Sequence, residues 1–89
     1  MKCVLSVLGK DRPGIVAGVA VTLNECGANI DDISQTILGD MFSMTMLTTL
    51  NPEIANFDTV QAKLAQEAEK LGVQMTLQRQ DVFRYMYEV

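Results

Sequence analysis

The stretch from Gly9 to Val16 holds the residue types most able to do chemistry, because its pattern indicates a strand end, a sharp turn and a helix start. The first backbone N–H groups of a helix have no partners within the helix, and that end is electropositive. A carboxylate or a phosphate can therefore dock there. Gly14 has no side chain, so a ligand can approach the backbone closely. Asp11 adds a carboxylate that could hold an ammonium group, and the combination would suit a free amino acid.

The same residues also have a purely structural interpretation, which the sequence leaves open. Asp11 can cap the helix through its side chain, and Pro13 stands where a first helical turn tolerates proline. Gly14 then only relieves steric crowding. Arg12 either clamps a ligand carboxylate or faces solvent.

The composition excludes several kinds of catalysis. The 89 residues include no histidine, so the chain has no imidazole base and no histidine metal ligand. Cys3 and Cys26 stand far apart without a CxxC motif, which favours two small, buried, reduced thiols over a metal or redox site. Asp31 and Asp32 are adjacent on a predicted strand and should point to opposite faces, so solvated charge is favoured over a cation site with Asp40. We predict no enzyme activity, no metal and no cofactor.

Charge and hydropathy bear on the partners and the compartment. Seven Lys+Arg stand against eleven Asp+Glu, and a net charge of −4 disfavours binding to a nucleic acid backbone. No apolar run approaches the roughly 20 residues of a membrane span. The first residues enter an apolar strand pattern directly, so we expect no signal peptide and a cytoplasmic location.

Six elements must position these residues. Apolar residues that alternate or run continuously predict strands at 2–8, 29–38, 41–50 and 73–79. Apolar residues at spacings of three and four predict helices at 15–26 and 57–71. The buried stripes are expected to be Ile15, Val16, Val19, Leu23 and Cys26 in the first helix, and Phe57, Val60, Leu64, Ala68 and Leu71 in the second. Gly27 and Gly72 are expected to end the helices, Asn56 to cap the second, and Gly39-Asp40 to form a hairpin turn.

The order β-α-β-β-α-β predicts an α+β, ferredoxin-like fold in one domain spanning residues 1–89. Right-handed crossovers would place two helices on one face of a four-stranded antiparallel sheet. The other face would then be bare, with Met41 and Leu47 exposed, so we predict a homodimer. Asp81 could start a short C-terminal helix that carries Val82, Phe83, Tyr85 and Met86. That tail either covers the sheet of a partner or remains loose.

A family resemblance rests on two of these segments. Asp11-Arg12-Pro13-Gly14-Ile15-Val16 follows a strand, and Asn29-Ile30 opens the next one. Together with the element order from residue 2 to residue 79, this pattern resembles the ACT domain, a small regulatory module of amino-acid metabolism. The continuation through residues 29–36 is similar to the small stand-alone ACT proteins of bacteria and archaea.

The resemblance implies a ligand site at an interface, because ACT domains pair by their sheets or helices and often bind effectors between two copies. By position, the implied ligand-binding residues are Asp11, Arg12, Pro13, Gly14, Ile15, Val16, Asn29 and Ile30. The N–H groups of Gly14 and Ile15 would take the carboxylate of an amino-acid effector. The side chain of Asn29 would hydrogen-bond its amino or carboxyl group.

The function predicted from the sequence is a non-catalytic regulatory module that binds an amino acid at a homodimer interface. The alternative is an adaptor without a small ligand, because an ACT domain unattached to an enzyme must act through a regulated protein partner. Other proteins of this topology fit less well. An acylphosphatase needs a glycine-rich anion loop, an RNA-binding domain needs exposed aromatic residues on a basic sheet face, and a copper chaperone needs a CxxC motif.

Overall fold

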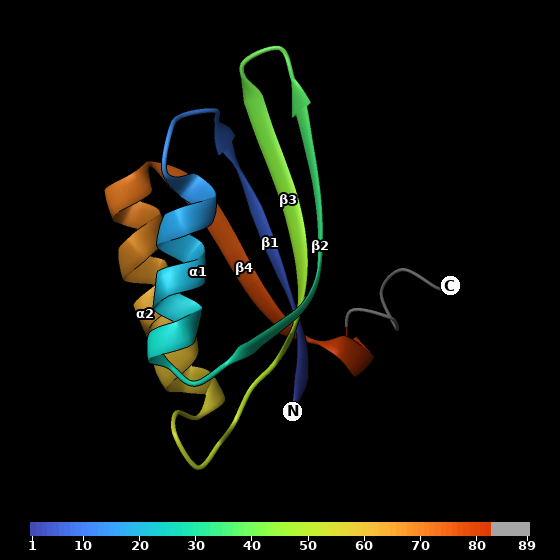
Figure 1. The fold of residues 1–89 in the computed structure, drawn as a ribbon, viewed down its shortest axis with the longest axis vertical. Helices are drawn as coiled ribbons and strands as arrows, with labels where there is room; N and C mark the ends of the chain where they lie inside the picture. The colour runs from blue at the N-terminus through green and yellow to red at the C-terminus, as the bar shows by residue number, and fades with distance from the viewer. Residues whose placement is uncertain (83–89) are drawn as a thin grey trace.

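Residues 1–82 are described in a computed structural model, and they form the predicted βαββαβ order. The elements are β1 (Lys2–Lys10), α1 (Ile15–Glu25), β2 (Asn29–Leu38), β3 (Met41–Thr49), α2 (Phe57–Leu71) and β4 (Val73–Arg79). The strands form one antiparallel sheet in the order β2-β3-β1-β4. Both helices lie on the same face of this sheet (Figure 1). The predicted α+β, ferredoxin-like fold is therefore confirmed.

The predicted boundaries hold to within two residues, and the largest difference lies at the end of β1. This strand continues through Gly9 and Lys10, which pair with Phe42 and Met41 of β3. Gly9 was expected to begin the loop, but it lies in the strand, where β4 passes close by. A Cβ at Gly9 would lie only 2.7 Å from Cγ1 of Val73.

The helix ends follow the local signals in the sequence. Gly27, directly after the cap residue of α1, has a φ of 70°. The side chain of Asn56 caps α2 by accepting a hydrogen bond from the N–H of Thr59 at 2.9 Å. Gly72 ends α2 in the left-handed conformation. Each feature confirms a predicted start or stop.

The core lies between the two helices and the sheet. Its buried side chains include Cys3, Leu5 and Val7 of β1, Ile15, Val19 and Leu23 of α1, Phe42, Met44 and Met46 of β3, and Val60 and Leu64 of α2. Both cysteines are free and buried, and burial raises the pKa of the Cys3 thiol. Val16 is 36% exposed, so its predicted place in the buried stripe is wrong. On the helix, Val16 falls almost opposite Gly18, which faces Leu71 of α2, and this leaves it on the flank of α1 away from α2.

The helix-free face of the sheet is less apolar than the sequence suggested. Register places Ser6, Thr45 and Thr76 in a row across its middle. Exposed apolar side chains on this face gather near the β2–β3 turn and are Leu8, Leu38 and Met41.

Two further expectations concern the chain end and the membrane. Residues 80–82 have helical backbone, whereas Phe83, Tyr85 and Met86 of the predicted tail helix lie outside the described residues. Among residues 1–82, neither helix is long and apolar enough to cross a membrane.

Candidate functional site

The loop between β1 and α1 begins beside the hairpin turn that joins β2 to β3. The N–H of Asp11 donates to the carbonyl of Asp40 at 2.6 Å, which ties the loop to the turn between β2 and β3. Three residues later, Gly14 has a φ of 90° and directly precedes α1. A Cβ at Gly14 would meet no atom within 4 Å, so the space beside this backbone is open.

The start of α1 has no side-chain cap, and no acidic residue offsets the positive end of the helix dipole. Its first helical hydrogen bond runs from the N–H of Gly18 to the carbonyl of Gly14 at 2.9 Å, so the N–H groups of residues 15–17 have no acceptor in the helix. No side chain caps this end, and the first turn of α1 contains no acidic residue. The prediction that Asp11 caps the helix is wrong, because Gly14 takes the cap position. Pro13 likewise precedes the helix instead of standing in its first turn.

Arg12 has a partner that neither sequence alternative anticipated. Its Nη1 donates to the carbonyl of Leu71 at 2.9 Å, at the end of α2. Gly72 follows directly, and a Cβ there would lie 3.3 Å from the same Nη1. The guanidinium therefore supplies a donor to the carbonyl of Leu71, the last residue of α2, which lies beyond the reach of the hydrogen bonds within the helix.

The remaining loop residues could contact a ligand mainly through their backbone groups. Ile15 is 2% exposed and belongs to the core, so only its N–H group is available to a ligand. Pro13 is exposed, and Val16 is partly so.

Asn29 and Ile30 lie at the opposite end of the sheet from this loop. Asn29 pairs with Thr49, which pairs with Lys2 at the beginning of β1. The loop leaves the sheet after Lys10 at the other end of that strand. Eight strand steps separate the two ends, or about 26 Å. A single chain therefore does not bring together the two groups of predicted site residues.

Asn29 uses its side chain within the chain. Its Nδ2 donates to Oδ1 of Asp31 at 2.7 Å, and the hydroxyl of Thr49 donates to Oδ2 at 2.6 Å. The hydrogen bond from Thr49, followed by that from Asn29, holds the pKa of Asp31 below its ordinary value. Asp31 is exposed, yet two donors set the orientation of its carboxylate.

Sequence reasoning missed the role of Asp31 and Thr49. The pairing of β2 with β3 shifts between Ile30 and Asp32, so strict alternation fails there. The carboxylate of Asp31 reaches Thr49, and Asp32 opposes Leu47, two residues away on the same face. The prediction that the two aspartates point to opposite faces is therefore wrong. The Asn29–Asp31 spacing could have suggested their contact, but Thr49 required the register.

One surface groove lies between the two helices, away from the predicted site residues. A groove of about 150 Å³ between α1 and α2 is lined by Val21, Thr22, Glu25, Lys63, Gln66, Glu67 and Lys70. None of the predicted site residues is among them. In the part of the chain that the structure describes, no cluster of three or more His, Cys, Asp or Glu residues could hold a metal ion.

Comparison with known proteins places this fold and loop in a family. The sequence pattern of the ACT domain matches residues 2–78. The chain belongs to the ACT domain family. A UPF0237 protein of Methanocaldococcus jannaschii is 44% identical over 88 residues, covering 99% of this chain and 98% of that protein. ACT domains are regulatory and often bind amino acids or other small ligands.

Solved structures agree with the ACT assignment. An ACT domain protein from Streptococcus pneumoniae superposes with a TM-score of 0.81 at 38% identity, covering 98% of each chain. The regulatory subunit of aspartate kinase from Thermus thermophilus gives a TM-score of 0.67 at 24% identity, covering 86% of this chain and 50% of that chain. The second likeness concerns the fold alone.

Proposed function

We propose that the protein is a non-catalytic regulatory module that binds an amino acid between two copies of the chain. The observation that carries this proposal is the start of α1, with unpartnered N–H groups, no acidic residue in its first turn, and open space beside Gly14. Such an end attracts a carboxylate. Membership of the ACT family, whose domains often bind amino acids, supports the choice of ligand.

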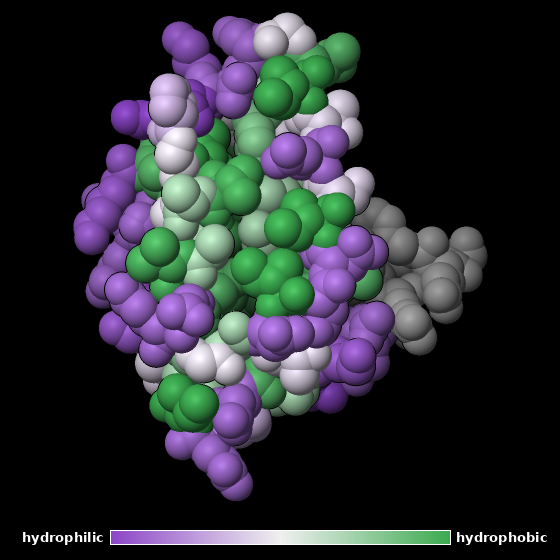
Figure 2. Space-filling view, viewed as in Figure 1, coloured by the Kyte–Doolittle hydropathy of each residue, from purple (hydrophilic) through white to green (hydrophobic). Residues whose placement is uncertain are grey.

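The exposed edge of β2 supports pairing with a second copy. β2 is an edge strand, and its free backbone groups can pair with another strand. Ile33 and Ile37 lie on its helix-facing side, opposite the buried Met46 and Phe42, yet they are 43% and 55% exposed. Figure 2 shows apolar side chains gathered on this face, in the region between α1 and β2, with polar side chains on both sides. A second copy would bury this strip.

Antiparallel pairing of two β2 strands would complete the site. It sets the Asn29 end of one strand beside the Leu38 end of the other, next to the Gly39–Asp40 turn. The loop at Asp11 is hydrogen-bonded to that same turn. The second copy would therefore bring its Asn29 and Asp31 toward the first copy's loop, which a single chain cannot do.

In this arrangement the chain's groups match both ends of an amino acid. The N–H groups of Gly14 and Ile15 would take the carboxylate. The ammonium group would meet the carboxylate of Asp11 or that of Asp31 from the second copy, and Asn29 would add a polar contact. In this proposal the carboxylates hold the ammonium group, and the site binds its ligand without catalysing a reaction.

The first experiment is a thermal-shift screen with each of the twenty amino acids, run beside sedimentation of the ligand-free chain. We expect a dimer at micromolar concentration and an increase in Tm with one or a few amino acids. A monomer under these conditions would contradict the shared site.

A mixing experiment tests whether each site takes residues from two chains. Gly14→Asp and Asn29→Ala, each tested alone, should strongly reduce the shift. A heterodimer of the two variants would regain one intact site, with the unaltered loop from one chain and the unaltered Asn29 from the other. We expect calorimetry of the mixture to show binding at a reduced number of sites. No recovery after proven subunit exchange would mean that each site lies within one chain.

A second function, that of a protein adaptor without a small ligand, is favoured by one observation. Leu38 and Met41 are 79% and 44% exposed on the helix-free face, where β2 pairing does not cover them. A well-folded dimer that shifts with none of the twenty amino acids would favour the adaptor. Loss of a captured protein partner on Leu38→Ser would then assign that surface.

A further inference from the structure

The loop between β1 and α1 is held at two points that belong to different parts of the fold. The N–H of Asp11 is bound to the hairpin turn at Asp40, and the guanidinium of Arg12 is bound to the last turn of α2 at Leu71. Residues 12 and 71 are 59 positions apart in the chain. One side chain therefore links the loop directly to the end of α2.

Two glycines allow close packing around the end of α2. Gly72 is left-handed, and a Cβ there would lie 3.3 Å from Nη1 of Arg12. In α1, a Cβ at Gly18 would lie 3.2 Å from Cδ1 of Leu71, so the absence of a side chain lets the two helices approach. Both distances are tighter than ordinary carbon contacts. The end of α2 is thus set closely against the first turns of α1 and against Arg12.

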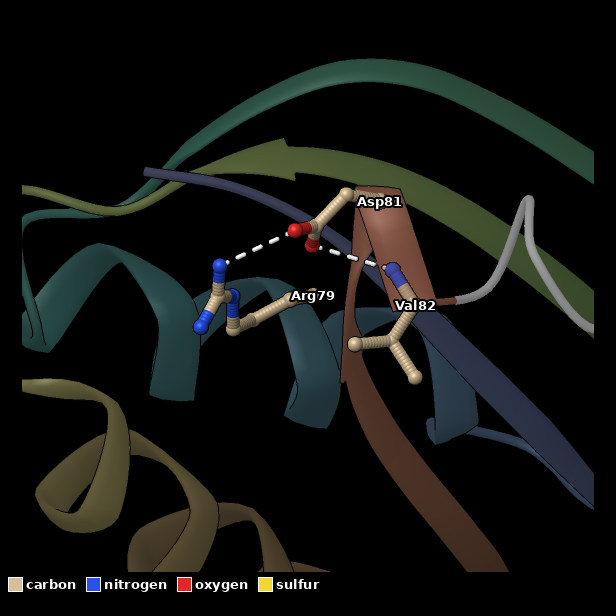
Figure 3. A network of polar contacts seen from close by, with 3 residues as sticks. All are labelled: Arg79, Asp81 and Val82. Carbon is tan, nitrogen blue, oxygen red and sulfur yellow. Dashed lines mark hydrogen bonds and ion pairs between the residues drawn. The ribbon is translucent and has the colours of Figure 1, made fainter.

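Arg12 also has donors to spare. A guanidinium carries five N–H groups, and its hydrogen bond here is to a neutral carbonyl. Within residues 1–82 the one ion pair joins Arg79 and Asp81 at 2.9 Å (Figure 3). Arg12 therefore has no carboxylate partner in this part of the chain. The Leu71 carbonyl is neutral, whereas a carboxylate would offer the guanidinium an opposite charge and two acceptor oxygens, so an incoming carboxylate would compete with that carbonyl.

We propose that Arg12 is the positioning residue that couples occupancy of the loop to the end of α2. A carboxylate at the start of α1 draws the guanidinium from the Leu71 carbonyl, and the last turn of α2 and the beginning of β4 loosen. This inference rests on the proposed function for its trigger, whereas the link between Arg12 and Leu71 stands without it. Through this coupling, ligand binding at the loop would change the end of α2, where a regulated partner could sense it.

The link itself is tested without any ligand. Amide hydrogen exchange should rise about two- to fivefold over residues 69–73 in Arg12→Ala, the range expected for loss of one exposed charged contact. Arg12→Lys, which keeps a single point donor, should give an intermediate rise. Gly72→Ala should shift the amide NMR signals of residues 11–14 in the wild-type background and not in Arg12→Ala. Equal shifts in both backgrounds would overturn the link.

The trigger is tested with the twenty amino acids of the thermal-shift screen, each at 10 mM. An amino acid that raises the Tm should also raise exchange over residues 69–73 in the wild type. In Arg12→Ala it should produce no further rise there. Unchanged or slower exchange in the wild type would overturn the coupling. If no amino acid binds, the proposed function fails, and the ligand-free comparison still decides whether Arg12 holds α2.

Discussion

Replacement of Gly14 by aspartate offers the sharpest test of the proposed site. Gly14 has a φ of 90°, and its missing Cβ would point into open space. A Cβ there meets no atom within 4 Å, so we expect the substitution to be accommodated and to place a carboxylate where the amino acid's own carboxylate is proposed to bind. We therefore expect the ligand to be repelled while the fold survives.

The cost to stability follows from two opposing effects. A residue with a side chain at positive φ costs about 1–2 kcal/mol, with aspartate and asparagine near the lower end. A carboxylate beside the start of α1 returns about 0.3–1 kcal/mol. Gly14→Asp should thus lose about 0–1 kcal/mol of unfolding free energy. Gly14→Asn carries the same backbone strain without the charge and should lose about 1 kcal/mol.

The assay is the Tm with and without the selected amino acid. At one hundred times its Kd a ligand stabilises the wild type by about 2.7 kcal/mol, or about 10–20 °C for a chain of this size. If the affinity of Gly14→Asp falls one hundredfold, the same concentration stabilises by about 0.4 kcal/mol, or about 2–3 °C. Gly14→Asn should keep a larger shift than Gly14→Asp. A folded Gly14→Asp with the full wild-type shift would refute binding at the start of α1.

Three further predictions concern the dimer, the second helix and pH. Ile33→Asp should convert the dimer to a monomer in sedimentation, because the new charge lies on the helix-facing side of the β2 edge. Asn56→Ala should lower the free energy of unfolding in urea by about 1 kcal/mol, because the N–H of Thr59 loses its acceptor. Asp31 has a lowered pKa in the folded chain, so its stabilising effect over Asp31→Asn should be complete above its unfolded pKa of about 3.9. That effect should disappear as the pH falls through the folded pKa, which urea melts between pH 2 and pH 7 can follow.

Each of these predictions has a matched control. Thr36→Asp places the same charge on the other face of β2 and should leave the dimer intact, so dissociation by both variants would contradict the assigned strip. Gln61→Ala, on the exposed side of α2, should change stability by less than about 0.5 kcal/mol. Thr49→Val removes the first donor to Asp31 and should shrink the pH-dependent difference. An undiminished difference would assign the lowered pKa to another cause.

Local signals predicted the elements well where the residues that decide them are neighbours in sequence. The second helix followed from its apolar stripe, from Asn56 at its start and from Gly72 at its end. Both ends held, and the middle of the stripe is buried, whereas Phe57 and Leu71 at its two ends are only partly buried. The cap of α1 was mispredicted for a tertiary reason. Asp11 stands at a plausible cap position, but its N–H is bound to Asp40 of the hairpin turn, and the helix begins after Gly14.

The candidate site divides in the same way. The loop residues are contiguous, so the sequence placed them together at the start of a helix. Their relation to Asn29 depends on strand register, which sets the two groups at opposite ends of the sheet. Val16 was mispredicted for a similar reason. Helical spacing placed it in the apolar stripe, but only the packing of α1 decided that its flank of the helix would remain exposed.

The sequence by itself therefore determined the element order, the helix ends and the loop that opens α1. Each of these depends on residues within a few positions of one another, through apolar periodicity and backbone preference. Only the tertiary structure decided that Arg12 contacts Leu71 and that Thr49 orients Asp31, across 59 and 18 positions of the chain. Such contacts arise from helix packing and strand register. Both are set by how the whole core closes, and no local pattern of residues encodes them.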